Sequence, residues 1–269
     1  MIKVATIAGS DASGGAGIEA DLKTFEEYGV FGMSAVTLFS TMDSDNEWAQ
    51  TIFSVEEPVL HAQMDTILKG VGVDALKTGM LGNPYAVSLA SEYIREYKVV
   101  NYVLDPVMNC RNSDGESKNG LNTLIAEKLL PLSLVVTPNL FEAGQLAEAK
   151  TPTNLEEMKT VARRIYDRGA KHVFIKGGSK LNGHTSAIDL FFDGSHFNQV
   201  ESAMIDTKWT HGAGCTISAA ITAGLALGLD PYEAVSLAKK FITLTLRGTF
   251  PLNRWVTPGN PSAWRKGFN

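Results

Sequence analysis

The chain has 269 residues, of which 44% are hydrophobic, so it can bury a core large enough for a sizeable domain. Its formal net charge is −5, and no cluster of Lys and Arg offsets it, which argues against a nucleic-acid partner. No stretch of about 18 uncharged apolar residues occurs, so we expect neither a signal peptide nor a membrane partner. Two cysteines, Cys110 and Cys215, fit neither a disulfide scaffold nor a zinc site, and we expect a cytoplasmic protein.

Short apolar runs alternate along the chain with segments of helical periodicity. The expected strands lie at residues 4–8, 35–39, 99–104, 134–136 and 172–175. The expected helices lie at residues 18–28, 59–68, 84–97, 121–130 and 155–168. This alternation predicts βαβ units, and therefore an α/β fold in which helices cover both faces of a mostly parallel sheet.

A hairpin and a polar segment interrupt this pattern. Residues 186–192 and 196–200 flank Asp193-Gly194, a pair typical of hairpin turns, so an antiparallel edge is expected there. Residues 109–119 are polar and predict a mobile loop, a flap spanning about 109–120. Because neither an internal repeat nor a linker occurs, we interpret residues 1–269 as a single domain. The last twenty residues contain three prolines and are expected to wrap the surface.

A glycine-rich stretch, residues 9–17, lies between the first expected strand and the first expected helix. Residues 15–20, which overlap its end, match the dinucleotide pattern G-x-G-x-x-A, and Asp43 would supply the acid that binds a ribose. A dinucleotide fold, however, needs the first of these glycines directly after the strand, and here about six residues intervene. An NAD-binding domain therefore stays open only as an alternative. The other interpretations are that the turn binds a small polar ligand, or that it merely needs glycine for its backbone conformation.

A second glycine-rich stretch, residues 210–215, opens an apolar segment that predicts a buried helix reaching residue 227. Gly212 and Gly214 would let the free N–H groups of this helix end approach an anion, such as a phosphoryl group under attack. Cys215 lies in the first turn, where the helix end would lower the pKa of its thiol toward neutrality. We interpret Cys215 as a base or a nucleophile, with a buried core cysteine as the alternative.

Three other classes of protein come into question: a cysteine hydrolase, a P-loop kinase and a binding domain without catalytic activity. His211 lies four residues before Cys215 and leaves a cysteine hydrolase open, although a histidine just outside a helix start is equally well explained by capping or packing. No Gly-Lys-Ser/Thr triplet occurs, so a kinase built from this chain would not use a P-loop. A catalytically silent ligand-binding domain also stays open.

Six motifs occur in the order of a known enzyme family. They are Gly9-Ser10-Asp11 with residues 13–17, residues 77–81 (Lys-Thr-Gly-Met-Leu), residues 105–108 (Asp-Pro-Val-Met), residues 137–139 with 142–143 (Thr-Pro-Asn, Glu-Ala), residues 176–178 (Lys-Gly-Gly), and residues 211–216 (His-Gly-Ala-Gly-Cys-Thr). On these motifs the chain, from about residue 3 to residue 258, resembles the ribokinase-like superfamily. It is most similar to the branch of bacterial pyridoxal kinases and hydroxymethylpyrimidine (phosphate) kinases.

The resemblance implies a three-layer α/β/α sandwich, a flap over the substrate and a homodimer. It implies transfer of the γ-phosphoryl group of ATP, with Mg²⁺, to a hydroxymethyl group on a small heteroaromatic ring. The implied anion hole and catalytic base are Gly212, Ala213, Gly214 and Cys215. The implied ATP-binding residues are Asn139, Glu142, Lys176 and Gly214, and the implied metal-binding residues are Asp105 and Glu142. The implied substrate-ring contacts are Asp11 and Asp21, and Met80 matches a wall of the substrate pocket.

One departure from the family pattern bears on the substrate. Where the pyrimidine kinases have Ala-Gln-Asn, this chain has Ser-Thr-Met-Asp at residues 40–43, and Met42 cannot supply the donor and acceptor that an aminopyrimidine edge needs. We therefore expect phosphorylation of pyridoxal, pyridoxine and pyridoxamine, with Met42 beside the substrate and hydroxymethylpyrimidine kinase as the alternative. Cys110, on the expected flap, also favours pyridoxal, because a thiol can add to its aldehyde.

Overall fold

The computed structural model describes residues 1–108, 115–181, 185–205 and 211–266. Within them, a nine-stranded sheet has the order β3-β2-β1-β4-β5-β6-β7-β8-β9. The strands are β1 (Lys3–Asp11), β2 (Phe31–Asp43), β3 (Ala49–Ser54), β4 (Ala75–Thr78), β5 (Tyr102–Leu104), β6 (Val135–Val136), β7 (Val173–Gly178), β8 (Ser186–Phe192) and β9 (Phe197–Ala203). Strands β2, β1, β4, β5, β6 and β7 pair in parallel, whereas β3, β8 and β9 pair antiparallel. The mostly parallel sheet and the β8–β9 hairpin confirm the sequence prediction.

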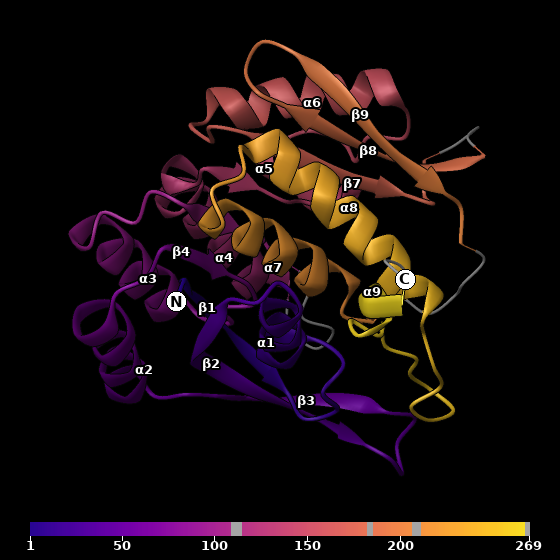
Figure 1. The fold of residues 1–269 in the computed structure, drawn as a ribbon. Helices are drawn as coiled ribbons and strands as arrows, with labels where there is room; N and C mark the ends of the chain where they lie inside the picture. The colour runs from indigo at the N-terminus through magenta and orange to yellow at the C-terminus, as the bar shows by residue number, and fades with distance from the viewer. Residues whose placement is uncertain (109–114, 182–184, 206–210, 267–269) are drawn as a thin grey trace.

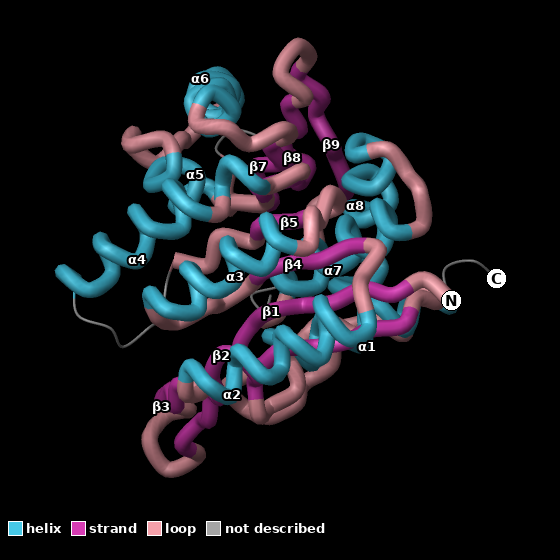
Figure 2. Tube along the Cα trace, turned by 90° about the vertical axis from the view of Figure 1, so that its left-hand side faces the viewer, coloured by secondary structure: helices cyan, strands magenta, loops and turns pink. Residues whose placement is uncertain are grey.

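Helices cover both faces of this sheet (Figures 1 and 2). One layer consists of α1 (Gly17–Glu27), α7 (Ala213–Ala226) and α8 (Pro231–Arg247). The other consists of α2 (Glu57–Met64), which continues into a π-helical turn (Asp65–Val71), α3 (Pro84–Glu96), α4 (Gly115–Lys128), α5 (Leu140–Leu146) and α6 (Leu155–Asp167). A 3-10 turn (Leu130–Leu132) follows α4. The result is the three-layer α/β/α sandwich that the motifs imply.

Neighbouring residues of the central strands point into opposite helix layers. In β5, Leu104 packs in the core that α2 to α6 cover, whereas Val103 packs with α7 and α8. In β6, Val136 and Val135 divide in the same way. Both faces are therefore dry, which explains why these strands are continuous apolar runs rather than alternating ones.

Several features differ from the sequence prediction. Strands β3 and β4 and helices α5 and α8 were not predicted, although Asp230 and Glu233 form a capping box with Pro231 at the start of α8. Helix α4 begins at Gly115, so residues 115–120 are helical rather than part of a flap. A polar composition alone does not distinguish a helix from a loop, which is why this prediction failed. The rest of the expected flap, residues 109–114, lies outside the described residues.

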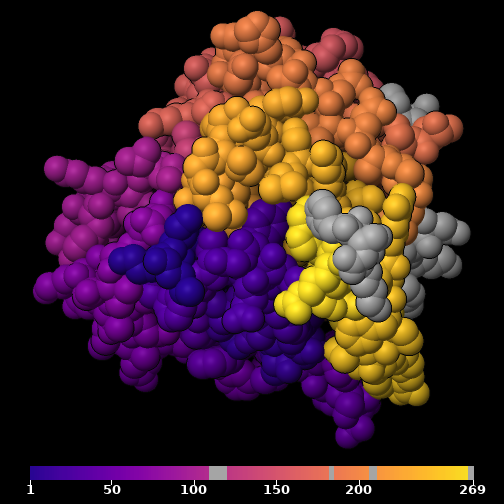
Figure 3. Space-filling view, in the orientation of Figure 1, coloured from indigo at the N-terminus to yellow at the C-terminus, as the bar shows by residue number. Residues whose placement is uncertain are grey.

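The C-terminal segment packs against the N-terminal third of the chain (Figure 3). The ring of Trp264 stacks on that of Tyr28 with centroids 6.2 Å apart, and Arg265 Nε donates to Glu27 over 2.8 Å. Residues 248–262 contain no helix, as the prolines predict, and only the single turn α9 (Ala263–Lys266) follows. In the described part of the chain, no helix has both the length and the apolar character needed to cross a membrane.

Candidate active site

The N-terminus of α7 forms an anion-binding end. Gly212 precedes the helix with a φ of +76°, a conformation that favours glycine, and a Cβ there would collide with the carbonyl oxygen of Gly15. No side chain that the structure describes caps this end of the helix, and its first turn, Ala213 to Cys215, lines a cavity. The N–H groups of such an open first turn, together with the helix dipole, bind negative charge.

The cavity has a volume of about 740 Å³ and lies at the carboxyl ends of the parallel strands. Asp105 follows β5, Asn139 follows β6, and Lys176 lies near the end of β7. Three adjacent strands thus deliver polar groups to one edge of the sheet, where open α/β folds bind their ligands. Most of the rest of the wall is apolar and includes Val107, Leu140, Phe141, Pro152, Met204, Ile205, Ile217, Ile242 and Leu246.

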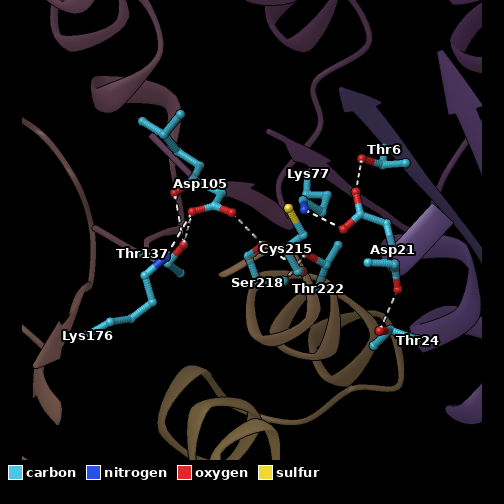
Figure 4. Close-up of polar contacts among 12 residues, drawn as sticks. Thr6, Asp21, Thr24, Lys77, Asp105, Thr137, Lys176, Cys215, Ser218 and Thr222 are labelled. Atoms are coloured by element: carbon cyan, nitrogen blue, oxygen red, sulfur yellow. Dashed lines mark hydrogen bonds and ion pairs between the residues drawn. The ribbon is translucent and has the colours of Figure 1, made fainter. Parts of the chain in front are cut away.

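Asp105 is buried at the centre of this polar group. One of its carboxylate oxygens accepts from Lys176 Nζ over 3.0 Å, and the other accepts from Ser218 Oγ over 3.0 Å (Figure 4). Burial alone would lower the pKa of Lys176, but the carboxylates of Asp105 and Glu142 outweigh it and raise that pKa, so the lysine is a cation. Sequence reasoning missed Ser218, although its spacing of three residues from Cys215 places both on one face of α7.

Glu142 and Asn139 form a capping box at the start of α5. The side chain of Asn139 accepts from the N–H of Glu142 over 3.0 Å, and the Glu142 carboxylate accepts from the N–H of Asn139 over 2.8 Å. Burial raises the pKa of Glu142 to about 7, with a further contribution from Asp105, while Lys176 opposes the shift. The structure therefore brings together all four residues that the resemblance assigns to ATP or metal on this side: Asp105, Asn139, Glu142 and Lys176.

Cys215 lies in the first turn of α7, partly buried and lining the cavity. Burial raises the pKa of its thiol to about 11, and the carboxylates of Asp21 and Asp105 add to the rise, whereas Lys77 and the N–H of Gly17 oppose it. The expectation of a thiolate at neutral pH is therefore wrong for the free protein. The helix end would lower the pKa of the thiol, but this effect is outweighed because protein atoms and two carboxylates surround Cys215.

Behind Cys215 lies a completely buried ion pair that sequence reasoning did not predict. Lys77 Nζ is 2.7 Å from Asp21 Oδ1, and neither side chain has exposed surface. The other oxygen of Asp21 accepts from Thr6 Oγ1 over 2.7 Å (Figure 4). This corrects the prediction that Asp21 contacts the substrate ring, because a carboxylate with no exposed surface cannot touch a ligand in this conformation.

Asp11 closes the first glycine-rich turn. Its carboxylate accepts from the N–H and Oγ of Ser13 and from the N–H of Ala16, and it lies 2.7 Å from His211 Nε2. Burial would raise the pKa of Asp11, but these hydrogen bonds from His211 and Ser13 lower it. Asp11 has little exposed surface, so its contact with a substrate stays a prediction. Among the described contacts, His211 Nε2 pairs with Asp11 and not with Cys215.

Met42 lies on the antiparallel ribbon formed by β2 and β3. It is directly opposite Gln50, so both side chains share one face, and Gln50 Nε2 donates to Ser40 Oγ over 2.6 Å. Met80 is partly buried, and its carbonyl oxygen accepts from Thr37 Oγ1 over 2.8 Å. Neither methionine lines the described cavity, so their contact with a substrate stays a prediction, as does that of Cys110, which lies outside the described residues.

The family model for phosphomethylpyrimidine kinase matches residues 11–260. The chain belongs to this family. It is 46% identical to the pyridoxine kinase of Bacillus subtilis over 98% of this chain and 97% of that protein, and 37% identical to the hydroxymethylpyrimidine/phosphomethylpyrimidine kinase of the same organism over 99% and 97%. This membership excludes the NAD-binding and hydrolase alternatives as explanations of the glycine-rich turns.

Solved structures of the family share the whole fold. The ADP complex of Bacillus subtilis pyridoxal kinase superposes with a TM-score of 0.95 at 46% identity, covering 98% of this chain and 99% of that one. The Staphylococcus aureus pyridoxal kinase in complex with AMP-PCP and pyridoxal superposes with a TM-score of 0.92 at 41% identity, covering 99% and 96%. The similarity extends over both helix layers and the full sheet.

Proposed function

We propose that this chain transfers the γ-phosphoryl group of ATP to the 5′-hydroxymethyl group of pyridoxal, and also of pyridoxine and pyridoxamine. The observation that carries the proposal is the meeting of the open end of α7, the thiol of Cys215 and the cation of Lys176 in one cavity. Phosphoryl transfer needs mainly positioning and charge neutralisation, and these groups supply both. Relatives that bind ADP or pyridoxal support the choice of substrates.

In the proposed reaction, the substrate hydroxyl binds next to Cys215 Sγ. The thiol orients the alcohol, and in its thiolate form it takes the hydroxyl proton, so an O–H bond breaks and an S–H bond forms. The alcohol oxygen then bonds to the γ-phosphorus as the bond to the bridging oxygen of ADP breaks. The N–H groups of Ala213 and Gly214, with Lys176, stabilise the negative charge on the transferring group.

Two carboxylates that line the cavity fit Mg²⁺. Asp105 and Glu142 offer hard carboxylate oxygens within electrostatic range of each other, and Mg²⁺ is commonly held by one or two carboxylates together with substrate phosphates. Among the described residues, no cluster of three or more His, Cys, Asp or Glu side chains forms a cage for a metal. The ion would neutralise phosphate charge.

The apolar wall of the cavity fits an adenine ring. Ile242 and Leu246 of α8 and Met204 face the same space as Lys176, so a nucleotide could place its base on these side chains and its phosphates at the lysine and Asn139. We therefore assign this cavity to ATP, with the hydroxymethyl group of the vitamer next to Cys215.

The decisive experiment is a coupled assay of ADP release with a panel of acceptors. ADP should form only when ATP, a divalent metal and a B6 vitamer are present together. Reactions lacking one component provide the controls. Tight binding of NADH without any ADP formation would contradict the proposal.

Hydroxymethylpyrimidine is a second candidate substrate, since the matching family model is that of a phosphomethylpyrimidine kinase. Met42→Gln should raise the kcat/KM for hydroxymethylpyrimidine relative to pyridoxal by about tenfold, because an amide can pair with the aminopyrimidine edge. The amide of Gln50 on the same face already provides one such group, and Gln50→Leu is the matched test of its contribution. An unchanged ratio in both variants would place the ring elsewhere.

The remaining predictions from the sequence stay proposals. Cys110 adds to the aldehyde of pyridoxal, so Cys110→Ser should lower kcat/KM for pyridoxal more than for pyridoxine, which has no aldehyde; equal effects on the two would contradict this. The chain forms a homodimer, and sedimentation of the purified protein should give about twice the monomer mass. A cytoplasmic location also remains a prediction.

A further inference from the structure

The reaction steps above use neither Lys77 nor Asp21, although both lie next to Cys215. Their ion pair, 2.7 Å long, joins β4 to α1 with no exposed side-chain surface on either partner. Removing two charges from water costs several kcal/mol per ion, and well-packed apolar residues are often equally stable in such a place. A contribution to folding is therefore a weak explanation for this pair.

Lys77 points at the thiol as well as at the carboxylate. Figure 4 shows its Nζ on the side of Cys215 Sγ, with the Asp21 carboxylate holding it from α1. Lys77 and Cys215 interact electrostatically, and each favours the charged form of the other. We propose that Lys77 is a positioning residue for the phosphoryl transfer proposed above: its ammonium group, anchored by Asp21, stabilises the thiolate of Cys215.

Charges on four elements around Cys215 determine how readily the thiol ionises. Besides burial, the carboxylates of Asp21 on α1 and Asp105 after β5 raise its pKa, and Lys77 on β4 is the largest influence that lowers it. Lys176 on β7 also interacts favourably with the thiolate, but its ammonium group is already bound to Asp105 over 3.0 Å. Lys77 is therefore the cation whose removal should change Cys215 most.

Asp21 has two opposite effects on the thiol. It holds Lys77 in place, but its own negative charge disfavours a second negative charge on sulfur. During the reaction Lys77 keeps its proton, while the hydroxyl proton moves to sulfur and cancels the thiolate charge. Removing the cation and removing the carboxylate should therefore shift thiol ionisation in opposite directions, which a purely structural pair would not do.

The test measures alkylation of Cys215 by iodoacetamide as a function of pH, without ATP or vitamer. Because the chain has two cysteines, Cys110→Ser provides a background in which Cys215 is the only thiol. At pH 8.5, Lys77→Met should slow alkylation by about tenfold or more, since each pKa unit changes the thiolate fraction tenfold. Asp21→Asn should move the pH profile the other way and speed alkylation.

A double variant covers the case in which Lys77→Met alone does not fold because it leaves Asp21 unpaired. Asp21→Asn with Lys77→Met removes both charges, and it should be alkylated more slowly than Asp21→Asn alone. Loosening of the fold would instead expose the thiol and speed alkylation in every variant. The matched control is Lys239→Met, which breaks a second buried pair of the same length, 2.7 Å to Asp189, and should leave the profile within twofold.

Turnover is measured on the same variants. Lys77→Met should lower kcat and leave the KM for ATP nearly unchanged, because Lys77 acts through Cys215 and not on the nucleotide. A profile that does not shift in Lys77→Met, or that shifts to lower pH, would overturn the inference. Shifted alkylation without ADP formation in the unmodified protein would uphold the role of Lys77 and contradict the kinase function instead.

Discussion

The two glycine-rich turns begin helices that pack against each other, but their polar groups are used differently. In the first turn, residues 9–17, Asp11 binds three groups of the turn itself, and Glu19 accepts from Ser10 Oγ and from the N–H of Asp11. In the second, none of the described side chains caps α7, and the first helical residues line the cavity. The number of glycines does not predict whether the polar groups of a turn are bound internally or left open. A turn whose donors already have internal partners stabilises the fold, whereas a turn with open donors can bind a ligand.

The two turns also hold each other in place. The carbonyl of Gly15 packs against Gly212, and the N–H of Gly17 favours the thiolate form of Cys215 and so opposes the rise of its pKa. His211, directly before Gly212, binds Asp11 of the first turn. The closed turn thus acts as the support for the open one, and substitutions in the two should fail in different ways.

The largest effect is expected from breaking the open turn. Gly212→Ala should lower kcat by about 10²- to 10³-fold, because its φ of +76° and the contact with Gly15 would force the helix end away from the transferring group. The matched control lies at the other end of α7: Gly228 has a φ of +90°, but none of the described atoms lies within 4 Å of where its Cβ would be. Gly228→Ala should lose some stability and retain kcat. Equal kcat values in the two variants would contradict an anion hole at Gly212.

The second-largest effect on activity is expected from substitution of Cys215, where the two turns meet. Cys215→Ala should lower kcat by about 10²-fold, because general-base catalysis is lost, while the KM for ATP changes little. Since the thiol has a pKa of about 11, the thiolate fraction and the activity should rise with pH between about 7 and 9. Cys215→Asp should recover part of the activity without that rise, because a carboxyl group is already ionised there. Wild-type turnover in Cys215→Ala would make the cysteine a packing residue.

The smallest effect is expected from weakening the closed turn. Asp11→Asn should cost about 1–3 kcal/mol of unfolding free energy at pH 7, measured by urea denaturation, because hydrogen bonds to a charged group are lost. The folded-state pKa of Asp11 lies below its unfolded value, so its contribution is present above about pH 4 and is lost as the pH falls through the folded pKa. Exposed Asp45→Asn is the control. An equal difference from wild type at pH 3 and pH 7 would contradict the sign of this shift.

Much of the architecture could be predicted because the central strands are buried on both faces. Val103 and Leu104, like Val135 and Val136, enter different cores, and this produces apolar runs that periodicity analysis detects. Strand β3 escaped prediction because it lies at the sheet edge with most of its residues partly or fully exposed. Helix α8 escaped it too, although its capping box was visible in the sequence. The central strand β4 and helix α5 were also missed, because four and seven residues are too few to give a clear periodicity.

The sequence by itself determined the residue types and the motifs from which the site is built: the glycines before α7, Cys215 within its first turn, and polar residues at successive strand ends. Only the tertiary structure decided how these groups are charged and which of them meet. It paired Asp21 with Lys77, which lies 56 residues away, and Asp11 with His211, which lies 200 residues away. It also raised the pKa of Cys215, where the helix end alone predicted a fall. The physical reason is that ionisation depends on burial and on neighbouring charges, and both arise from chain segments that only folding brings together.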